Sequence, residues 1–159
     1  MIYSTATVPV NPNGVVPLSR AQVWQGLVLK ARDARLFLPP GYCTKCDVTV
    51  EGDGFIVREA TILNDDLVEG ITFEPENKVS FHQWSGPREG VIINEIQEDA
   101  AGNLQLKFYC FTGLRNAAAG GAEEQAEQAM MDSPDKGYRR ALLATLDRTR
   151  ALVVEGRIL

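Results

Sequence analysis

The chain has 159 residues, of which 45% are hydrophobic and 23% are charged, and its formal net charge is −5. A chain of this length predicts a single domain, residues 1–159, that buries roughly 70% of the surface exposed by its unfolded form. The acidic balance, with no Lys/Arg run longer than Arg139-Arg140, argues against the concentrated basic surface that nucleic acids and anionic membranes attract. The sequence therefore predicts no nucleic-acid partner.

The amino-terminal residues 1–14 contain no basic region, no apolar core and no cleavage motif, so we expect no secretion signal. No apolar run approaches the roughly 20 residues that a membrane-spanning helix requires. The three cysteines, an odd number, do not make a disulfide framework. These features predict a cytoplasmic protein with reduced thiols and no membrane span.

The first part of the chain predicts one strand followed by two short helices. Residues 2–10 are rich in β-branched side chains, and Pro9 confines this strand to an edge or an end. Ser19 and Gln22 have the spacing of a capping box, which opens a helix. A second short helical turn is expected over 36–38, before Pro39-Pro40-Gly41 ends it. The first helix has an apolar stripe made of Val23, Trp24, Leu27 and Val28.

Alternation of apolar and polar residues begins at Cys46 and predicts strands rather than helices. Short segments rich in Gly, Asn, Asp and Pro separate the alternating runs and predict tight turns. Strands this short and this regularly spaced are typical of an antiparallel meander. The expected strands are 46–50, 55–63, 67–74, 79–84, 91–98 and 104–111.

The hydrophobic pattern also predicts how the first of these strands pair, because a slip of one residue would reverse every side chain. Pairing Phe73 with Val79 sends His82 and Trp84 to the outer face of the sheet. The turn at 64–66 leaves two registers open. One places Arg58 with Glu69 and Phe73 inside, and the other groups Glu59 with Glu69.

The last hairpin has a clearer register. Pairing Glu98 with Leu104 sets Asn94 opposite Phe108 on an apolar face, while the opposite face collects polar residues. The outward set then includes Gln97, Gln105 and Lys107. This pairing therefore predicts an inward amide among apolar side chains.

The carboxyl-terminal part predicts helices. Residues 115–122 form a linker of small residues, and 123–131 predict a helical lead-in. Ser133 before Pro134 is typical of a helix cap and first residue, and Gly156 is typical of a helix end. The apolar residues of this long helix recur at i, i+3, i+4 and i+7, as Tyr138, Ala141, Leu142, Thr145, Leu146, Leu152 and Val153.

This order of elements resembles the helix-grip fold, and several runs resemble the AtaL-like family of the START/birch-pollen-allergen (SRPBCC, polyketide cyclase-like) superfamily. The runs are RLFLPPGY (35–42), EGDGFIVREATI (51–62), ITFEPENKVSF (71–81), EGVIINEI (89–96) and TLDRTRALVVEGRI (145–158). The resemblance implies an α+β fold in which a curved antiparallel sheet of about seven strands wraps around a long carboxyl-terminal helix. It further implies a hydrophobic cavity between them. The wider superfamily includes lipid and hormone binders, polyketide cyclases and aromatases, and co-chaperones.

Cys43 and Cys46 have the spacing of a zinc-binding pair, with Cys110 and the single His82 as further nominal ligands. An offset of three in an extended chain points Cys43 and Cys46 to opposite faces of a sheet. The predicted register also separates His82 from Cys110. We therefore expect reduced thiols, no metal and no cofactor.

Polar residues within the apolar strands are candidates for contact with a ligand. An inward Asn94 or Arg58 is costly unless it is paired or hydrogen-bonded, and a few such groups orient a ligand in an apolar cavity. A desolvated Glu69 could act as a general acid or base, its pKa raised by burial. The expected apolar lining is Phe73, Phe81, Ile92, Ile96, Leu106 and Phe108 from the sheet, with Tyr138, Leu142 and Leu146 from the long helix.

Three functions follow from these features. The favoured one is binding of a small hydrophobic or aromatic molecule, because no catalytic constellation stands out. The second is an enzyme of cyclase or aromatase type in which Glu69 or Arg58 moves protons. Replacing Glu69 by Gln would then distinguish the two, since only the enzyme loses function. The third is a protein-interaction domain with an exposed apolar patch around Trp84 and Tyr109. A homodimer is compatible with all three.

Overall fold

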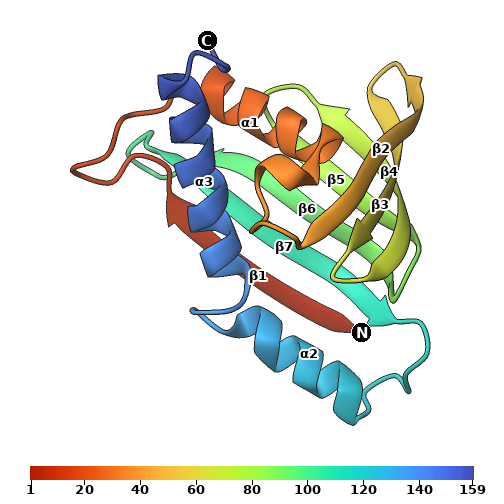
Figure 1. Cartoon of the computed structure of the whole chain (residues 1–159). Coiled ribbons are helices and arrows are strands. Elements are labelled where there is room, and N and C mark those ends of the chain that lie inside the picture. Colours follow the sequence, from red (N-terminus) through yellow and green to blue (C-terminus); the bar gives the residue numbers. More distant parts are fainter.

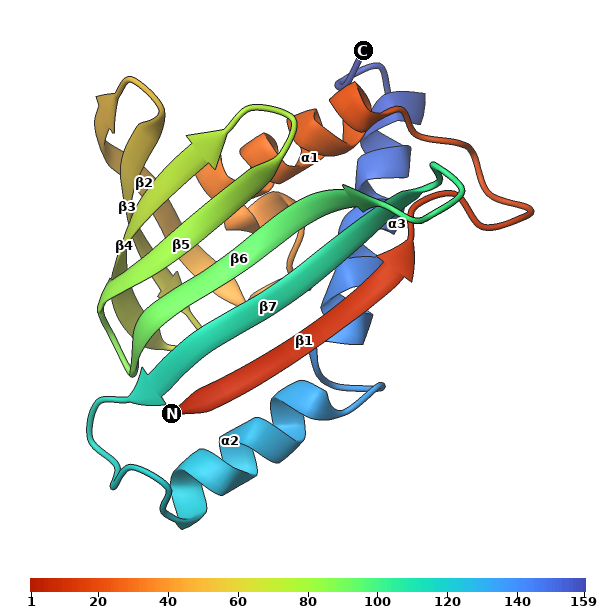
Figure 2. The same cartoon turned by 180° about the vertical axis from the view of Figure 1, so that it is seen from behind.

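The computed structural model describes all residues, 1–159, as one curved sheet with helices on its inner side and at one edge (Figure 1). Seven antiparallel strands form the sheet in the order β1-β7-β6-β5-β4-β3-β2, so that β1 pairs with β7 (Figure 2). The strands are β1 (Ile2–Pro9), β2 (Cys43–Gly52), β3 (Phe55–Ile62), β4 (Asp65–Glu74), β5 (Lys78–Ser85), β6 (Arg88–Glu98) and β7 (Leu104–Leu114). The helices are α1 (Arg20–Arg32), α2 (Ala122–Asp132) and α3 (Tyr138–Val154). The predicted α+β helix-grip fold is confirmed.

Helix α1 begins at the predicted capping box. Ser19 Oγ accepts a hydrogen bond from the Gln22 backbone N at 3.1 Å, and the Ser19 backbone N donates to Gln22 Oε1 at 2.9 Å. The helix runs for 13 residues and ends at Arg32, with Asp33 as its C-cap. The second predicted helix is one 3₁₀ turn at Ala34–Leu36, where Asp33 accepts a hydrogen bond from the Arg35 backbone N. Both elements thus begin where an oxygen satisfies the free N–H groups of a first turn.

Both hairpin registers expected from the hydrophobic pattern are confirmed. Phe73 pairs with Val79, and Glu98 pairs with Leu104. The turn between β3 and β4, where two registers were open, places Arg58 opposite Glu69. Consequently, β3 and β4 each send one buried charged side chain toward the interior.

Helix α3 begins later than predicted. Ser133 ends α2 as its C-cap, and the N-cap of α3 is Gly137. The Ser-Pro pattern misled the prediction because a proline that can open one helix equally prevents the preceding one from continuing. Gly137 is buried where α2 meets α3, and a Cβ on it would overlap the carbonyl oxygen of Met131.

Replacing Ser19 by Ala should lower the free energy of unfolding by about 1 kcal/mol, because the first turn of α1 loses its side-chain acceptor. Urea denaturation measures this change. Ser133→Ala is the matched control, since Ser133 caps no helix with its side chain and should leave stability unchanged. Equal losses in the two variants would contradict a specific role for the capping box.

Strand β2 contains two register shifts, between Cys43 and Lys45 and between Val48 and Val50. The first shift returns Cys46 to the same side as Cys43, and both are buried in one small cluster. The expectation that the two cysteines face opposite ways is therefore wrong. A β-bulge breaks the simple alternation from which it was drawn.

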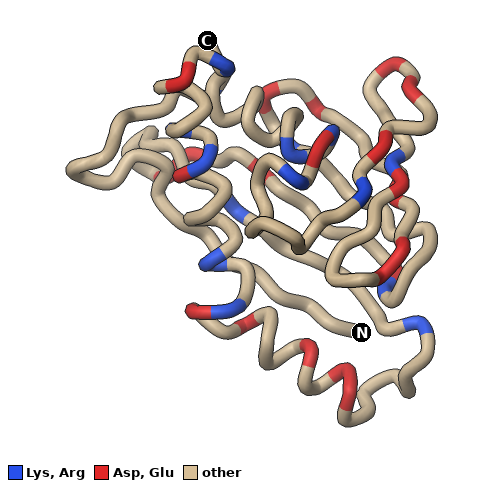
Figure 3. Tube along the Cα trace, in the orientation of Figure 1, with Lys and Arg blue, Asp and Glu red and all other residues tan.

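Helix α2 lies along the free edge of β1 (Figure 2). The Gln128 side chain pairs with the backbone of Tyr3: Gln128 Oε1 accepts from the Tyr3 N at 3.1 Å, and Gln128 Nε2 donates to the Tyr3 O at 2.6 Å. Ser4 Oγ donates to Asp132 one helical turn farther on. Acidic residues are spaced along the length of α2, and the helix contains no Lys or Arg (Figure 3).

Candidate functional site

A cavity of about 170 Å³ lies between the inner face of the sheet, the end of α1 and the start of α3. Most of its wall is apolar, and a few polar side chains converge on it. This combination is typical of a site for a small molecule. The lining residues are Lys30, Ala34, Leu38, Arg58, Ile62, Glu69, Phe81, Ile92, Asn94, Phe108, Tyr138 and Ala141.

Arg58 and Glu69 form a buried ion pair on neighbouring strands. Arg58 Nε donates to Glu69 Oε2 at 2.9 Å, and Gln83 Nε2 donates to Glu69 Oε1 at 2.8 Å. Arg58 Nη1 also donates to the carbonyl oxygens of Lys30 and Ala31, at 3.1 and 2.9 Å. Both carboxylate oxygens are therefore engaged, and Arg58 fastens the end of α1 to the sheet. Proton transfer by Glu69 would require this pair to open.

Lys30 reaches the cavity from the last turn of α1 and takes part in no ion pair. Its Nζ donates to Asn94 Oδ1 at 3.3 Å and lies 4.2 Å from the centroid of the Phe108 ring. The residue as a whole is half-buried, and its ammonium group is the enclosed part.

The surroundings of Lys30 disfavour its charge. Burial lowers the pKa of Lys30 to about 7, the positive charge of Arg58 adds to this effect, and the negative charge of Glu69 opposes it. A pKa near neutrality means that a large share of the molecules carry Lys30 as a neutral amine at pH 7. Such an amine has a free electron pair, which an ordinary protonated lysine lacks.

The Tyr138 hydroxyl is buried and has no hydrogen-bond partner. Its ring packs edge-on against Phe108, with 6.3 Å between the centroids. Burial raises the pKa of Tyr138 above its ordinary value, so the hydroxyl keeps its proton and remains a donor. A buried polar group without a partner costs about 1–3 kcal/mol. The thiol of Cys110 lies close to this hydroxyl and adds to the rise of its pKa.

The residues expected to line the cavity fall into two groups in the structure. Side chains that do line it are Arg58, Glu69, Phe81, Ile92, Asn94, Phe108 and Tyr138. Side chains that pack in or against the main core instead are Phe73, Ile96, Leu106, Leu142 and Leu146. The reason is α1, whose Val23, Leu27 and Ala31 fill the space between the sheet and α3 at that end.

Sequence reasoning missed Lys30, which is the least compensated charge in the cavity. A signal was present: Lys30 follows Leu27 by three positions and Val23 by seven, which puts it on the buried stripe of α1. A charged residue at the end of a helix is usually solvated, and this expectation concealed it. Further lining residues that were missed are Ala34, Leu38, Ile62 and Ala141.

The cysteines and the histidine do not meet. Cys43 and Cys46 share one buried cluster, Cys110 lies in another beside Met131, and His82 is exposed on the outer face. No group of three or more His, Cys, Asp or Glu side chains is arranged to hold a metal ion. Burial raises the pKa of the Cys43 thiol, which makes it a poor nucleophile.

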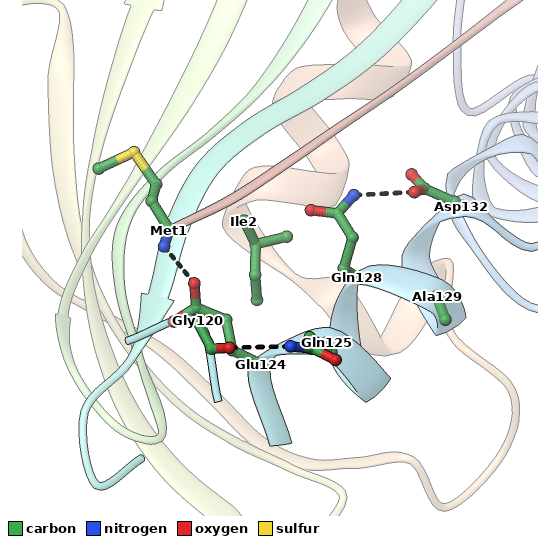
Figure 4. Close-up of a pocket in the computed structure, with 8 residues that line it drawn as sticks. All are labelled: Met1, Ile2, Gly120, Glu124, Gln125, Gln128, Ala129 and Asp132. Atoms are coloured by element: carbon green, nitrogen blue, oxygen red, sulfur yellow. Dashed lines mark hydrogen bonds and ion pairs between the residues drawn. The ribbon is translucent and has the colours of Figure 1, made fainter. Parts of the chain in front are cut away.

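A second hollow, of about 480 Å³, opens at the surface between the start of β1 and α2 (Figure 4). Its polar groups already bind one another: the Met1 amino group pairs with Glu124, and Gln128 Nε2 donates to Asp132 Oδ2 at 2.8 Å. No buried polar group there lacks a partner. The cavity between the sheet, α1 and α3 is therefore the candidate site, although it is the smaller of the two.

The outer face of the sheet carries several aromatic side chains. Trp84 is 57% exposed and lies over Gly70, where a Cβ would overlap its ring. Phe111 contacts the rings of Tyr3 and Tyr109, at centroid distances of 5.1 and 6.4 Å. Because its own chain leaves Trp84 uncovered, the protein-interaction function stays a prediction.

Comparison with protein families gives a match to the model of acetylaranotin biosynthesis cluster protein L (AtaL) over residues 4–156. No curated protein sequence matches the chain. None of the helices is both long and apolar enough to cross a membrane.

Solved structures share the fold at low sequence identity. The Zhui aromatase/cyclase from Streptomyces sp. R1128 has a TM-score of 0.60 at 17% identity, covering 96% of this chain and 94% of that one. XoxI from Bacillus cereus has a TM-score of 0.61 at 17% identity, covering 92% and 97%. TTHA0849 from Thermus thermophilus has a TM-score of 0.66 at 11% identity, covering 94% and 97%. These likenesses support the helix-grip fold.

Proposed function

Because the chain belongs to the AtaL family, which it matches over nearly its whole length, we propose that it binds a small, mainly apolar molecule carrying a hydrogen-bond acceptor. The ligand occupies the cavity between the sheet, α1 and α3. The observation that carries the proposal is the Lys30 amino group, which lies in a mainly apolar cavity and has a single hydrogen-bond partner. An acceptor atom on the ligand supplies a second partner.

The volume of the cavity limits the size of the ligand. An engineered apolar cavity of about 150 Å³ holds benzene, so a cavity of about 170 Å³ suits one aromatic ring or a short chain. Drug-sized ligands occupy larger cavities, of roughly 300–1,000 Å³. The protein in this conformation therefore selects compounds of the size of a substituted benzene.

A cyclase-type or aromatase-type enzyme is the second candidate. The likeness to the Zhui aromatase/cyclase favours it, as does an amine of lowered pKa inside the cavity. The cavity volume favours a small substrate over a long polyketide chain. Turnover of a single-ring substrate, abolished by filling the cavity, would support this function over simple binding.

Filling the cavity should weaken binding. Ala141 lines it from α3, so Ala141→Phe should weaken binding of a single-ring probe such as benzyl alcohol by about tenfold or more, because one buried ring is worth more than about 1.4 kcal/mol. Isothermal titration calorimetry measures the affinity. Native mass spectrometry of the purified protein additionally shows whether a molecule is already bound and gives its mass.

The matched control is Ala144→Phe, an equal change on an exposed position one helical turn along α3. This variant should keep the affinity of the unmodified protein. If the unmodified protein binds no single-ring probe, or if the two variants bind it equally, the cavity is not the binding site.

A further inference from the structure

The cavity contains the amino group of Lys30, which has no counter-ion and is available to a bound ligand. Lys30 Nζ has one hydrogen-bond partner, the neutral amide of Asn94 on β6, and it lies over the Phe108 ring on β7. The nearest charges are Arg58 on β3 and Glu69 on β4, and both Glu69 oxygens are already bound by Arg58 and Gln83. From α3, the uncharged Tyr138 side chain lines the same cavity.

The position of this amine is fixed. Lys30 and Ala31 form the end of α1, and their carbonyl oxygens accept hydrogen bonds from Arg58. Arg58 is itself held by Glu69, so the base of the Lys30 side chain is tied to two strands of the sheet. An enclosed amine that is held in place and is close to another cation has the features of lysines that form imines.

We propose that Lys30 is a nucleophile that captures a small aldehyde or ketone in the cavity as an imine. This inference rests on the proposed function, since it names the chemical class of the ligand in the same cavity. The Phe108 ring borders both the Lys30 amine and the Tyr138 ring, so one small aromatic ligand can contact the amine and these rings together.

The step balances without any oxidant or further reactant. The free electron pair of Lys30 Nζ attacks the carbonyl carbon, and the carbonyl oxygen takes up a proton to give a carbinolamine. The carbon–oxygen bond then breaks, and the oxygen leaves as water with the two hydrogens lost by nitrogen. The product is a carbon–nitrogen double bond, and water reverses the reaction.

A lowered pKa makes Lys30 the lysine with the largest neutral share near pH 7. An ordinary lysine with a pKa of about 10.4 is neutral in fewer than about one molecule in a thousand at that pH. Lower intrinsic basicity offsets part of this advantage. We therefore expect Lys30 to react at least about tenfold faster than an exposed lysine.

The experiment uses benzaldehyde, which fits the cavity, with sodium cyanoborohydride to reduce the imine to a stable secondary amine. The unmodified protein is incubated at pH 7, and peptide mass mapping measures the rate of benzylation at each amine. The internal control is Lys107, which lies over the Tyr109 ring on the outer face, 4.9 Å from its centroid. The α-amino group of Met1, which pairs with Glu124, is mapped separately.

The expected result is that the tryptic peptide containing Lys30 is benzylated at least about tenfold faster than that containing Lys107. Excess benzyl alcohol, which cannot form an imine, should suppress the reaction at Lys30 alone. Lys30→Gln should lose this site of modification while Lys107→Gln keeps it.

Two outcomes separate this inference from the proposed function. Binding of benzyl alcohol with no preferred benzylation at Lys30 overturns the inference and leaves the binding function intact. Failure of benzyl alcohol to bind overturns the proposed function, and any selective benzylation of Lys30 would then not arise from ligand capture. Both measurements, benzyl alcohol binding and benzylation at Lys30, use the unmodified protein, so neither conclusion depends on whether a variant folds.

Discussion

Replacing Glu69 by Gln should lower the free energy of unfolding by about 3–5 kcal/mol, a large part of the stability of a typical domain. The substitution leaves the Arg58 guanidinium buried without a negative partner, because Arg58 is only 4% exposed and Glu69 is its ion-pair partner. Urea denaturation, monitored by the fluorescence of Trp24 and Trp84, measures the loss.

An apolar double variant tests the cause of this loss. Arg58→Met with Glu69→Leu removes both charges together, so most of the stability should return, as for other buried ion pairs replaced by apolar residues. The lost stability should not return completely, because the carbonyl oxygens of Lys30 and Ala31 also lose their hydrogen-bond donor, Arg58. Glu59→Gln is the matched control on the neighbouring strand β3, since Glu59 forms an exposed pair with Lys45. A comparable loss in that control would contradict the role assigned to burial.

The expected loss changes how the binder and the enzyme can be told apart. The sequence suggested that Glu69→Gln would separate the two functions. The structure shows that this substitution opens the ion pair that fastens α1 to the sheet. Lost activity would therefore reflect a disturbed fold as readily as a missing acid. Ala141→Phe and the Lys30 measurements are the appropriate comparisons, because they leave Arg58 and Glu69 in place.

Replacing Lys30 by Met should stabilise the protein, and the gain should depend on pH. A folded-state pKa of about 7, below the value of 10.5 expected for the unfolded chain, means that the folded protein binds fewer protons between these two values. Stability of the unmodified protein therefore rises with pH across this window. Below pH 7 the full penalty is present, on the order of 4 kcal/mol, and above pH 10.5 it disappears.

The measurement is the difference in unfolding free energy between Lys30→Met and the unmodified protein, taken from pH 6 to pH 10. The difference should be largest at pH 6 and should shrink steadily above pH 7. Taking a difference removes the contributions of groups that titrate in both proteins. Lys107→Met controls for the loss of a lysine that lies over an aromatic ring. A Lys30→Met advantage that stays constant across this range would show that Lys30 is not an uncompensated charge.

The sheet could be predicted because alternate residues along a strand lie on opposite faces, so the apolar pattern shows which residues face the interior. Pairing Phe73 with Val79 and Glu98 with Leu104 follows from keeping apolar residues together, and both pairs are observed. The bulges in β2 could not be foreseen, because an extra residue resets the alternation without leaving a distinct composition. This is why Cys43 and Cys46 were placed on opposite faces.

The candidate site was only partly predictable, because a cavity forms where packed side chains leave space. The inward positions of Asn94 and Phe108 follow from strand period and the register of the last hairpin. The inward position of Arg58 was one of two alternatives, which the structure decides. Which inward side chains leave space depends on where α1 packs, and no local pattern specifies that packing. The same limit applies to Lys30, whose buried position becomes evident only when the end of α1 is seen against the sheet.

The contact between Gln128 and β1 has a consequence for association between molecules. The Gln128 carboxamide directs one N–H and its carbonyl oxygen at Tyr3, the same pair that a neighbouring peptide offers, so Tyr3 at the sheet margin is already matched as if another strand lay beside it. A strand from a second molecule finds no free donor or acceptor at that point. The opposite margin, β2, is irregular and carries Lys45 and Asp47. Both margins thus oppose the edge-to-edge polymerisation to which open sheets are prone.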